Sequence, residues 1–288
     1  MKIAINAQQL SETHSLPEVL DVAESHGVKA VELWPANLAG GGTREENERF
    51  EKRDVAAAAA LLRERGFEVA CVTLGGDAAP LCFAAGGGER YADALRGAVD
   101  AAGALGARLV NTYNKGLPLA EWAAAVKPAA EYAASRGVVI TLENEAHDES
   151  ALPEDVAAAV ERVGSAGLAT QFDPCNYYHA YVEPFPTAYQ KIWQHIRYVH
   201  LKGGCHFDPA LPGVHQGSTM RDRTDAHIGY LPLPAAAFNV EAIIQALCRD
   251  GYDGWLTLEP HVPARDLDHY YAIEVPYLRQ LIARHARI

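Results

Sequence analysis

The stretch SRGVVITLENEAHDES, Ser135 to Ser150, passes from a turn signal into an apolar run and then into a cluster of charge. Gly137 stands where a helix would end, and the Val, Ile, Thr and Leu residues that follow favour a buried β-strand. Carboxylates come directly afterwards, beginning with Glu143 and Glu145. The stretch therefore predicts a helix end, a turn and a buried strand with an acidic tip.

The same order of helix, glycine and strand recurs along the whole chain. The junctions read SHG-VKAVELW, ERG-FEVACVTL, ALG-ARLVNTY, SRG-VVITLE, SAG-LATQFD and RDG-YDGWLTLE. The runs from Lys2 to Gln8 and from Arg197 to Gly204 bring the number of predicted strands to eight. Alternating strands and helices predict a parallel sheet with helical crossovers, and eight such units in 288 residues match one (β/α)8 TIM barrel over residues 1–288.

A doubly wound open sheet is the alternative architecture for such an alternation. Two glycine-rich segments could mark a nucleotide site in that fold, GGGT (Gly40 to Thr43) and GGGE (Gly86 to Glu89). Neither has the spacing of a phosphate-binding loop, so both are interpreted as ordinary loops.

Composition narrows the class of protein and its expected surroundings. The chain is 49% hydrophobic, and 37 acidic against 25 basic residues give a net charge of −12, which disfavours nucleic acid as a partner. Five scattered cysteines without a C-x-x-C pair favour a reducing cytoplasm. The N-terminus lacks a signal-peptide core and no run of 18 apolar residues occurs, so we expect no membrane association.

One long connection interrupts the repeat, between the seventh strand and the next helix, at about residues 205–237. In a barrel it would lie on the face that carries the active site. It contains His206 and Arg223 together with several Gly and Pro residues. We interpret it as a lid or substrate-specificity loop, because long connections inside compact domains are usually functional or disordered.

Parity along each strand predicts which side chains point into the barrel. In the stretch quoted above, Val139, Thr141, Glu143 and Glu145 share one face. The apolar residues Val138, Ile140 and Leu142 share the other. The same parity places these residues on inner faces near strand tips: Asn6, Gln8, Glu32, Trp34, Asn111, Tyr113, Gln171, Asp173, Tyr198, His200, Lys202, Thr257, Glu259 and His261.

Three carboxylates and one imidazole from four successive strands would then converge at the barrel axis. Buried charges without compensation are costly, and a divalent cation resolves that cost. Mostly oxygen ligands with one nitrogen suit Mn²⁺, Mg²⁺ or Co²⁺ better than a structural zinc. Purely structural roles are the alternative: a glutamate paired with a lysine, a hydrogen-bonded core histidine, or an aspartate that caps the next helix.

Five motifs give the chain a wider resemblance: VELW (Val31 to Trp34), TLEN (Thr141 to Asn144), FDPCN (Phe172 to Asn176), YVHLK (Tyr198 to Lys202) and DGWLTLE (Asp253 to Glu259). Together they resemble the xylose-isomerase-like superfamily of TIM barrels, in particular its sugar phosphate isomerase/epimerase family. Carried over to this sequence, the resemblance implies metal ligands at Glu143, Asp173, His200 and Glu259. Mn²⁺ is the expected metal, with Mg²⁺, Co²⁺ and Zn²⁺ left open.

The resemblance implies an isomerase or epimerase that removes a proton from a sugar or keto-polyol through a metal-stabilised enediolate. Glu143 and Glu259 would serve as base and acid. Lys202 would stabilise the developing oxyanion, or alternatively pair with Glu32 or Glu145. The same resemblance is compatible with a homodimer or a homotetramer.

Two departures from the epimerase pattern change which substrate and reaction are expected. Asn176 and His206 stand where many epimerases of this branch carry a histidine and an arginine that contact substrate. A lyase is therefore the alternative, similar to inosose dehydratases or to deglycosylases of 3-keto C-glycosides, with His147 or His206 acting on the leaving group. The expected substrate-binding residues in either case are Asn6, Trp34, Tyr113, Asn176, His206 and Arg223.

Two further alternatives belong to other classes of protein. The chain also resembles the related endonuclease IV barrels, which cut DNA. However, Asn176 stands where that family's pattern has a histidine ligand, and the net negative charge opposes the approach of DNA. A sugar-binding barrel without turnover is the other alternative, because ligand residues can be read from sequence more readily than catalysis.

Overall fold

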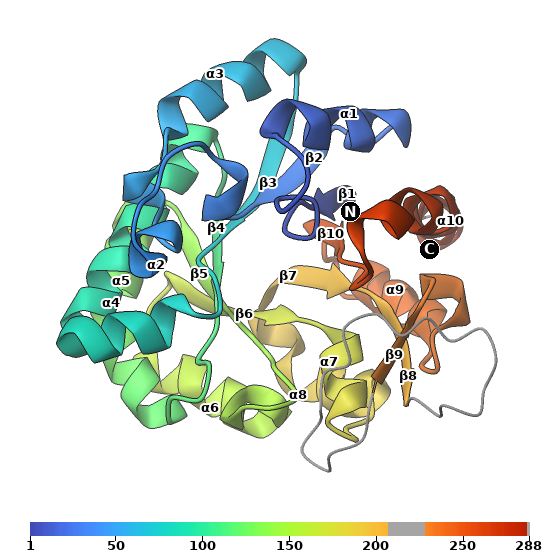
Figure 1. The fold of residues 1–288 in the computed structure, drawn as a ribbon. Coiled ribbons are helices and arrows are strands. Elements are labelled where there is room, and N and C mark those ends of the chain that lie inside the picture. The colour runs from blue at the N-terminus through green and yellow to red at the C-terminus, as the bar shows by residue number, and fades with distance from the viewer. Residues whose placement is uncertain (207–227, 287–288) are drawn as a thin grey trace.

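Eight parallel strands close into a barrel in the computed structural model, which describes residues 1–206 and 228–286 (Figure 1). Around the barrel the order is β1, β10, β7, β6, β5, β4, β3, β2. The strands are β1 (Lys2–Asn6), β2 (Ala30–Leu33), β3 (Glu68–Thr73), β4 (Leu109–Thr112), β5 (Val139–Glu143), β6 (Leu168–Phe172), β7 (Ile196–Leu201) and β10 (Trp255–Leu258). The predicted TIM barrel is therefore confirmed.

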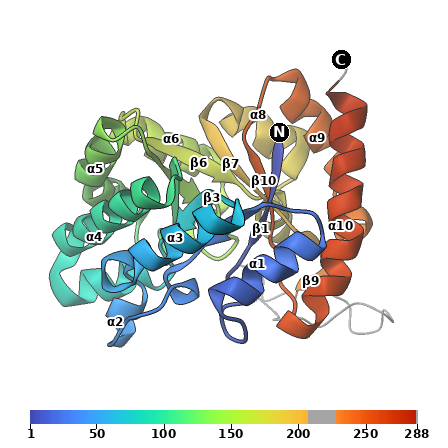
Figure 2. The ribbon, with the colours of Figure 1, turned by 90° about the horizontal axis from the view of Figure 1, so that it is seen from above.

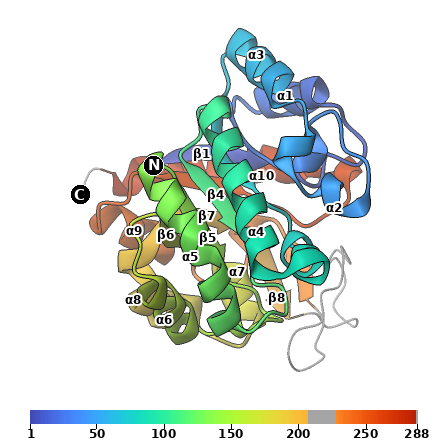
Figure 3. The same cartoon turned by 90° about the vertical axis from the view of Figure 1, so that its left-hand side faces the viewer.

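Helices form the outer layer of the barrel. They are α1 (Leu16–Ser25), α2 (Arg44–Asn47), α3 (Val55–Arg65), α4 (Ala78–Leu105), α5 (Leu119–Ser135), α6 (Pro153–Val163), α7 (Pro174–His179), α8 (Tyr189–Ile192), α9 (Val240–Arg249) and α10 (Ala264–His285). Figure 2 shows α10 along one side of the barrel, and Figure 3 shows α4 and α5 packed side by side. No helix in the described part of the chain is long and apolar enough to cross a membrane.

Glycines end most of the helices at the predicted junctions. Gly66 and Gly106, with φ of 67° and 79°, end α3 and α4 in the left-handed conformation that costs other residues energy. The SAG junction differs, because α6 ends three residues earlier, at Gly164 with φ of 62°. Gly167 is required for another reason: a Cβ there would collide with the carbonyl oxygen of Ala130.

The barrel interior has an apolar floor beneath a polar top. Small and aromatic side chains from several strands pack together as one cluster: Ala4, Ala30, Ala70, Cys71, Leu109 and Tyr198, with Val139 and Trp255 against them. Val138, Ile140 and Leu142 belong instead to the larger core that includes the helices. The parity prediction for this strand is thus confirmed, and the polar residues lie at the C-terminal ends.

A β-hairpin begins the long connection after the seventh strand. Gly203–His206 (β8) pairs antiparallel with Ile228–Leu231 (β9), and a short 3₁₀ turn at Leu233–Ala235 follows. The two ends of the expected loop over residues 205–237 therefore pair with each other as the strands of this hairpin. Arg223 lies outside the described residues, so its predicted role is untested.

A buried carboxyl on α10 predicts a pH dependence of stability. Glu274 accepts a hydrogen bond from the Leu233 N–H at 2.9 Å, and burial raises its pKa to about 8. The folded state therefore keeps a proton that the unfolded chain releases near pH 4.5, so this contribution to stability is complete below that pH and lost as pH rises toward 8. Relative to Glu274→Gln, the wild type should lose on the order of 3 kcal/mol of unfolding free energy between pH 5 and 8.5.

Urea unfolding of both proteins across this pH range measures the difference. The exposed Glu131→Gln is the matched control, and its difference from wild type should stay flat. A flat difference for Glu274→Gln as well would show that Glu274 is ionised in the folded protein throughout.

Candidate metal centre

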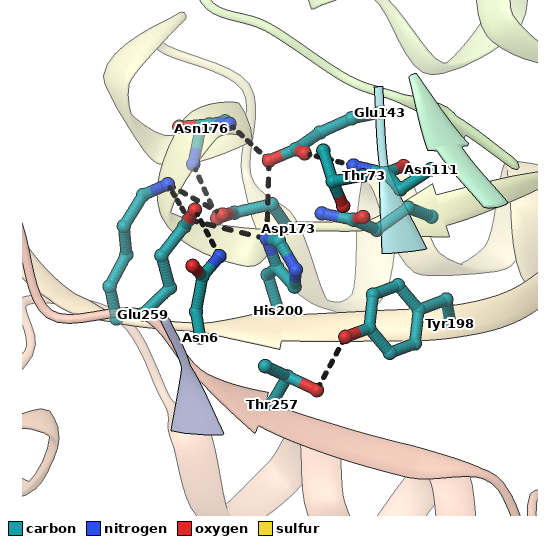
Figure 4. Close-up of polar contacts among 12 residues, drawn as sticks. Asn6, Thr73, Asn111, Glu143, Asp173, Asn176, Tyr198, His200, Thr257 and Glu259 are labelled. Atoms are coloured by element: carbon teal, nitrogen blue, oxygen red, sulfur yellow. Dashed lines mark hydrogen bonds and ion pairs between the residues drawn. The ribbon is translucent and has the colours of Figure 1, made fainter. Parts of the chain in front are cut away.

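The four residues expected to bind metal lie together at the C-terminal end of the barrel (Figure 4). Glu143 is the last residue of β5, Asp173 follows β6, His200 lies in β7 and Glu259 follows β10. Each offers one ligand atom, and these atoms all lie within 4.8 Å of one another. All four side chains are buried, with the most exposed, Glu259, at 3%.

Each of the three carboxylates has one oxygen fixed by an N–H donor. The pairs are Asn6 Nδ2 with Glu259 Oε1 at 2.9 Å, Asn111 Nδ2 with Glu143 Oε2 at 2.8 Å, and the Asn176 backbone N–H with Asp173 Oδ1 at 3.0 Å. The second oxygen of each faces the cluster. Neighbouring strands thus orient Glu259 and Glu143, and the first turn of α7 orients Asp173.

His200 is oriented by a carboxylate on the far side of its ring. Its Nε2–H donates to Glu32 Oε2 at 2.6 Å, and Glu32 also accepts from Tyr198 and Thr73. His200 Nδ1 then faces Glu259 Oε2 at 3.2 Å and makes no hydrogen bond with a described residue. A carboxylate behind a histidine that points its other nitrogen at a cation is a common arrangement in metal sites.

Lys202 lies between two of the carboxylates. Its Nζ is 2.8 Å from Asp173 Oδ2 and 2.9 Å from Glu259 Oε2. The alternative prediction, that Lys202 pairs with Glu32 or Glu145, is wrong. Lys202 follows β7 and contacts carboxylates at the ends of the strands on either side, whereas Glu32 binds His200.

Charge within the cluster shifts the pKa values of its members. Burial alone would lower the pKa of His200, but the carboxylates of Glu32 and Glu259 hold it well above its usual range. Burial would raise the pKa of Glu259, but Lys202 and His200 hold it well below its usual range. Glu259 is therefore ionised at neutral pH.

The donor set fits a divalent cation. Four buried carboxylates, counting Glu32, outnumber the one lysine, and such an excess of charge calls for a counter-ion. Oxygen donors with a single imidazole nitrogen suit a hard or borderline divalent ion. The unpartnered Nδ1 of His200 supplies the nitrogen.

A cavity of about 480 Å³ opens above the cluster. Glu143, Lys202 and Glu259 form its floor, and Trp34 and Tyr113 form an aromatic wall with ring centroids 6.1 Å apart. The volume matches a pocket for a small molecule. Two of the predicted substrate-binding residues, Trp34 and Tyr113, thus line this cavity.

Three other predicted substrate-binding residues occupy different positions. Asn6 donates to Glu259, and Asn176 Nδ2 donates to the Asn144 carbonyl at 2.8 Å, so both are placed to hold the cluster. His206 stacks on Tyr181 with centroids 4.2 Å apart and is not part of the cavity lining.

Several lining residues were absent from the predicted site. His261 Nε2 lies 3.3 Å from Glu259 Oε2, and strand parity had already placed it on the inner face. Glu12, Glu48 and Asp77 also line the cavity. They lie in segments between strands and helices, where no periodic signal indicates direction.

Comparison with known proteins gives a family and a set of similar folds. The family model for the xylose isomerase-like TIM barrel matches residues 20–281. The chain belongs to this family. No curated protein sequence matches the chain at a significant level.

Three similar solved structures share the xylose isomerase-like fold over nearly the whole chain. The probable 3-DHS dehydratase AsbF of Bacillus anthracis has a TM-score of 0.69 at 16% identity, covering 97% of this chain and 99% of its own. A D-tagatose 3-epimerase-like protein has 0.70 at 19%, with 99% of each chain covered. A xylose isomerase-like TIM barrel protein of Mycobacterium smegmatis in complex with magnesium has 0.72 at 17%, covering 99% of this chain and 97% of its own.

The contact between Glu32 and His200 predicts a defect in metal binding. In Glu32→Gln the imidazole loses its charged partner, so affinity for Mn²⁺ should fall about tenfold or more. Isothermal titration of the metal-free protein with Mn²⁺ measures this. Glu64→Gln, an exposed change on α3, is the control. Equal Mn²⁺ affinity in wild type and Glu32→Gln would contradict an orienting role for Glu32.

Proposed function

We propose that the protein is a divalent-metal-dependent isomerase or epimerase of a small sugar or keto-polyol. One observation carries the proposal: two fixed carboxylates, Glu143 and Glu259, face a shared cavity from strands that β6 and β7 separate. A substrate carbon between them can lose a proton to one carboxylate and receive a proton from the other. The similarity to a D-tagatose 3-epimerase-like protein agrees with this chemistry.

Glu143, Asp173, His200 and Glu259 would hold the cation, with Mn²⁺ as the first choice and Mg²⁺, Co²⁺ or Zn²⁺ as the others. When bound, the cation supplies positive charge that acidifies a C–H beside a carbonyl and stabilises the resulting enediolate. The similar structure with magnesium supports a hard divalent ion.

The chain's own groups divide the remaining work. Glu259 is ionised because Lys202 and His200 stabilise its charge against burial, so it is ready to accept a proton. Asn6 keeps its Oε1 in place during the transfer. Lys202, with two carboxylates as partners, keeps its proton and offers an N–H donor to an oxygen on which negative charge develops.

Removing the charge of Glu259 should stop the reaction. Glu259→Gln should lower turnover by at least about a hundredfold, because an amide cannot accept the proton. Incubation with Mn²⁺ and a panel of ketoses and inososes in D₂O measures both product and deuterium entering the substrate carbon. Far-ultraviolet circular dichroism checks that the variant folds.

Glu64→Gln is again the matched control and should keep wild-type exchange. Full activity in Glu259→Gln would remove this residue from the mechanism. Absence of exchange in the wild type across the whole panel, with Mn²⁺ shown to be bound, would reject the isomerase or epimerase and favour a binding protein.

A second candidate, a lyase, is favoured by Glu145. This carboxyl lines the cavity, and burial together with the nearby Glu143 raises its pKa to about 8. It therefore carries a proton at neutral pH and can donate it to a leaving hydroxyl during β-elimination. Glu145 fits this role better than the predicted His147 or His206, neither of which lines the cavity.

Glu145→Gln separates the two candidates. A lyase should lose dehydration by about a hundredfold in this variant while proton exchange at the substrate carbon continues. Dehydrated product is measured by its ultraviolet absorbance and exchange by mass spectrometry in D₂O. Unchanged dehydration in Glu145→Gln would exclude this residue as the acid.

A further inference from the structure

The outer half of the cavity is built by a different part of the chain from the metal centre. Segments after β1, β2, β3 and β4 supply its lining, whereas the predicted ligands come from β5, β6, β7 and β10. Three carboxylates, Glu12, Glu48 and Asp77, lie in this outer half. A substrate with its carbonyl end at the metal centre would place its tail here.

Glu48 is held against the cavity wall without a partner. A Cβ at position 75 would collide with Glu48 Oε2, so Gly75 is what allows this carboxylate to lie against the backbone. The Glu48 side chain makes no hydrogen bond or ion pair with a described residue, and Trp34 lies beside the same glycine. Its acceptor oxygens are thus available to hydroxyl donors.

Tyr113 is a second polar group without a partner in the cavity wall. Tyr113 is only 5% exposed, yet its hydroxyl makes no hydrogen bond with a described residue. The hydroxyl can donate or accept. Because the Tyr113 and Trp34 rings form one wall, they can also cover the C–H face of a polyol.

Each lysine of the lining, among the residues described, already faces a carboxylate. Lys202 is between Asp173 and Glu259 at 2.8 and 2.9 Å. Lys115 lies 4.0 Å from Asp77, which Arg44 also contacts at 3.0 Å. A phosphate or carboxylate on the substrate tail would therefore meet acidic groups.

We propose that the outer half of the cavity selects the hydroxyl-bearing tail of an uncharged polyol, with Glu48 and Tyr113 as its polar contacts, and rejects phosphorylated substrates. This inference rests on the proposed function, because it assumes that the reacting end of the substrate lies at the metal centre. Glu48 acts by charge as well as by hydrogen bonding: it accepts from hydroxyls and repels an anion.

Equilibrium binding to the Mn²⁺-loaded protein tests the inference without turnover. The probes are D-glucitol and myo-inositol, each compared with its phosphate, D-glucitol 6-phosphate or myo-inositol 1-phosphate. Wild type should bind each uncharged polyol at least about tenfold more tightly than its phosphate. Glu48→Gln, which keeps an acceptor but removes the charge, should reduce that preference by about threefold or more.

Two further variants separate charge, contact and folding. Tyr113→Phe should weaken polyol binding about threefold or more with Mn²⁺ affinity unchanged, because only a hydrogen bond is lost. Glu64→Gln removes one charge outside the cavity and should leave the preference as in wild type.

The inference is overturned if the phosphates bind as tightly as the polyols, if no polyol binds, or if Glu48→Gln leaves the preference unchanged. Deuterium exchange into a phosphorylated ketose in preference to its neutral form would overturn it while supporting the proposed function. Selective polyol binding without exchange in any substrate would support the inference and contradict the proposed function.

Discussion

The burial of four carboxylates at one end of a closed barrel is the constraint on which the rest of this structure depends. Each buried charge costs several kcal/mol unless hydrogen bonds or opposite charges compensate it. Asparagines on neighbouring strands, Lys202 and the His200 ring provide this compensation. Since these partners come from three strands, β1, β4 and β7, the cluster can exist only when those strands end at the same level as the strands that carry the carboxylates.

The interior of the barrel is accordingly divided into two layers. Apolar and aromatic side chains fill the floor of the barrel. Tyr198 links the layers because its ring packs below while its hydroxyl donates to Glu32. Glu32 in turn orients His200. A change in the packing of the apolar floor of the barrel can thus shift His200 through two hydrogen bonds, without altering any residue that lines the cavity.

In the proposed reaction, chemistry and selectivity belong to separate parts of the C-terminal face of the barrel. Side chains at the tips of β5, β6, β7 and β10 form the cluster, and they are fixed by strand register. Segments after the first four strands form the outer cavity, where Glu48 and Tyr113 lie. Connections after strands tolerate change better than the strands themselves, so one reacting centre can be combined with different substrate tails.

Sequence alone determined the barrel, the inner faces of seven strands and the four residues that converge, because alternation of side chains and of elements is a local property that repeats along the chain. Strand parity also placed Glu32, His261 and Lys202 inside, but it could not assign their partners. Tertiary structure decided that Lys202 meets Asp173 and Glu259 while Glu32 holds His200. It also decided that Asn6 and Asn176 are placed to hold the cluster and that Glu48 lines the cavity. Such pairings depend on barrel closure and on irregular segments, where the direction of a side chain follows from distant contacts and not from its neighbours in the sequence.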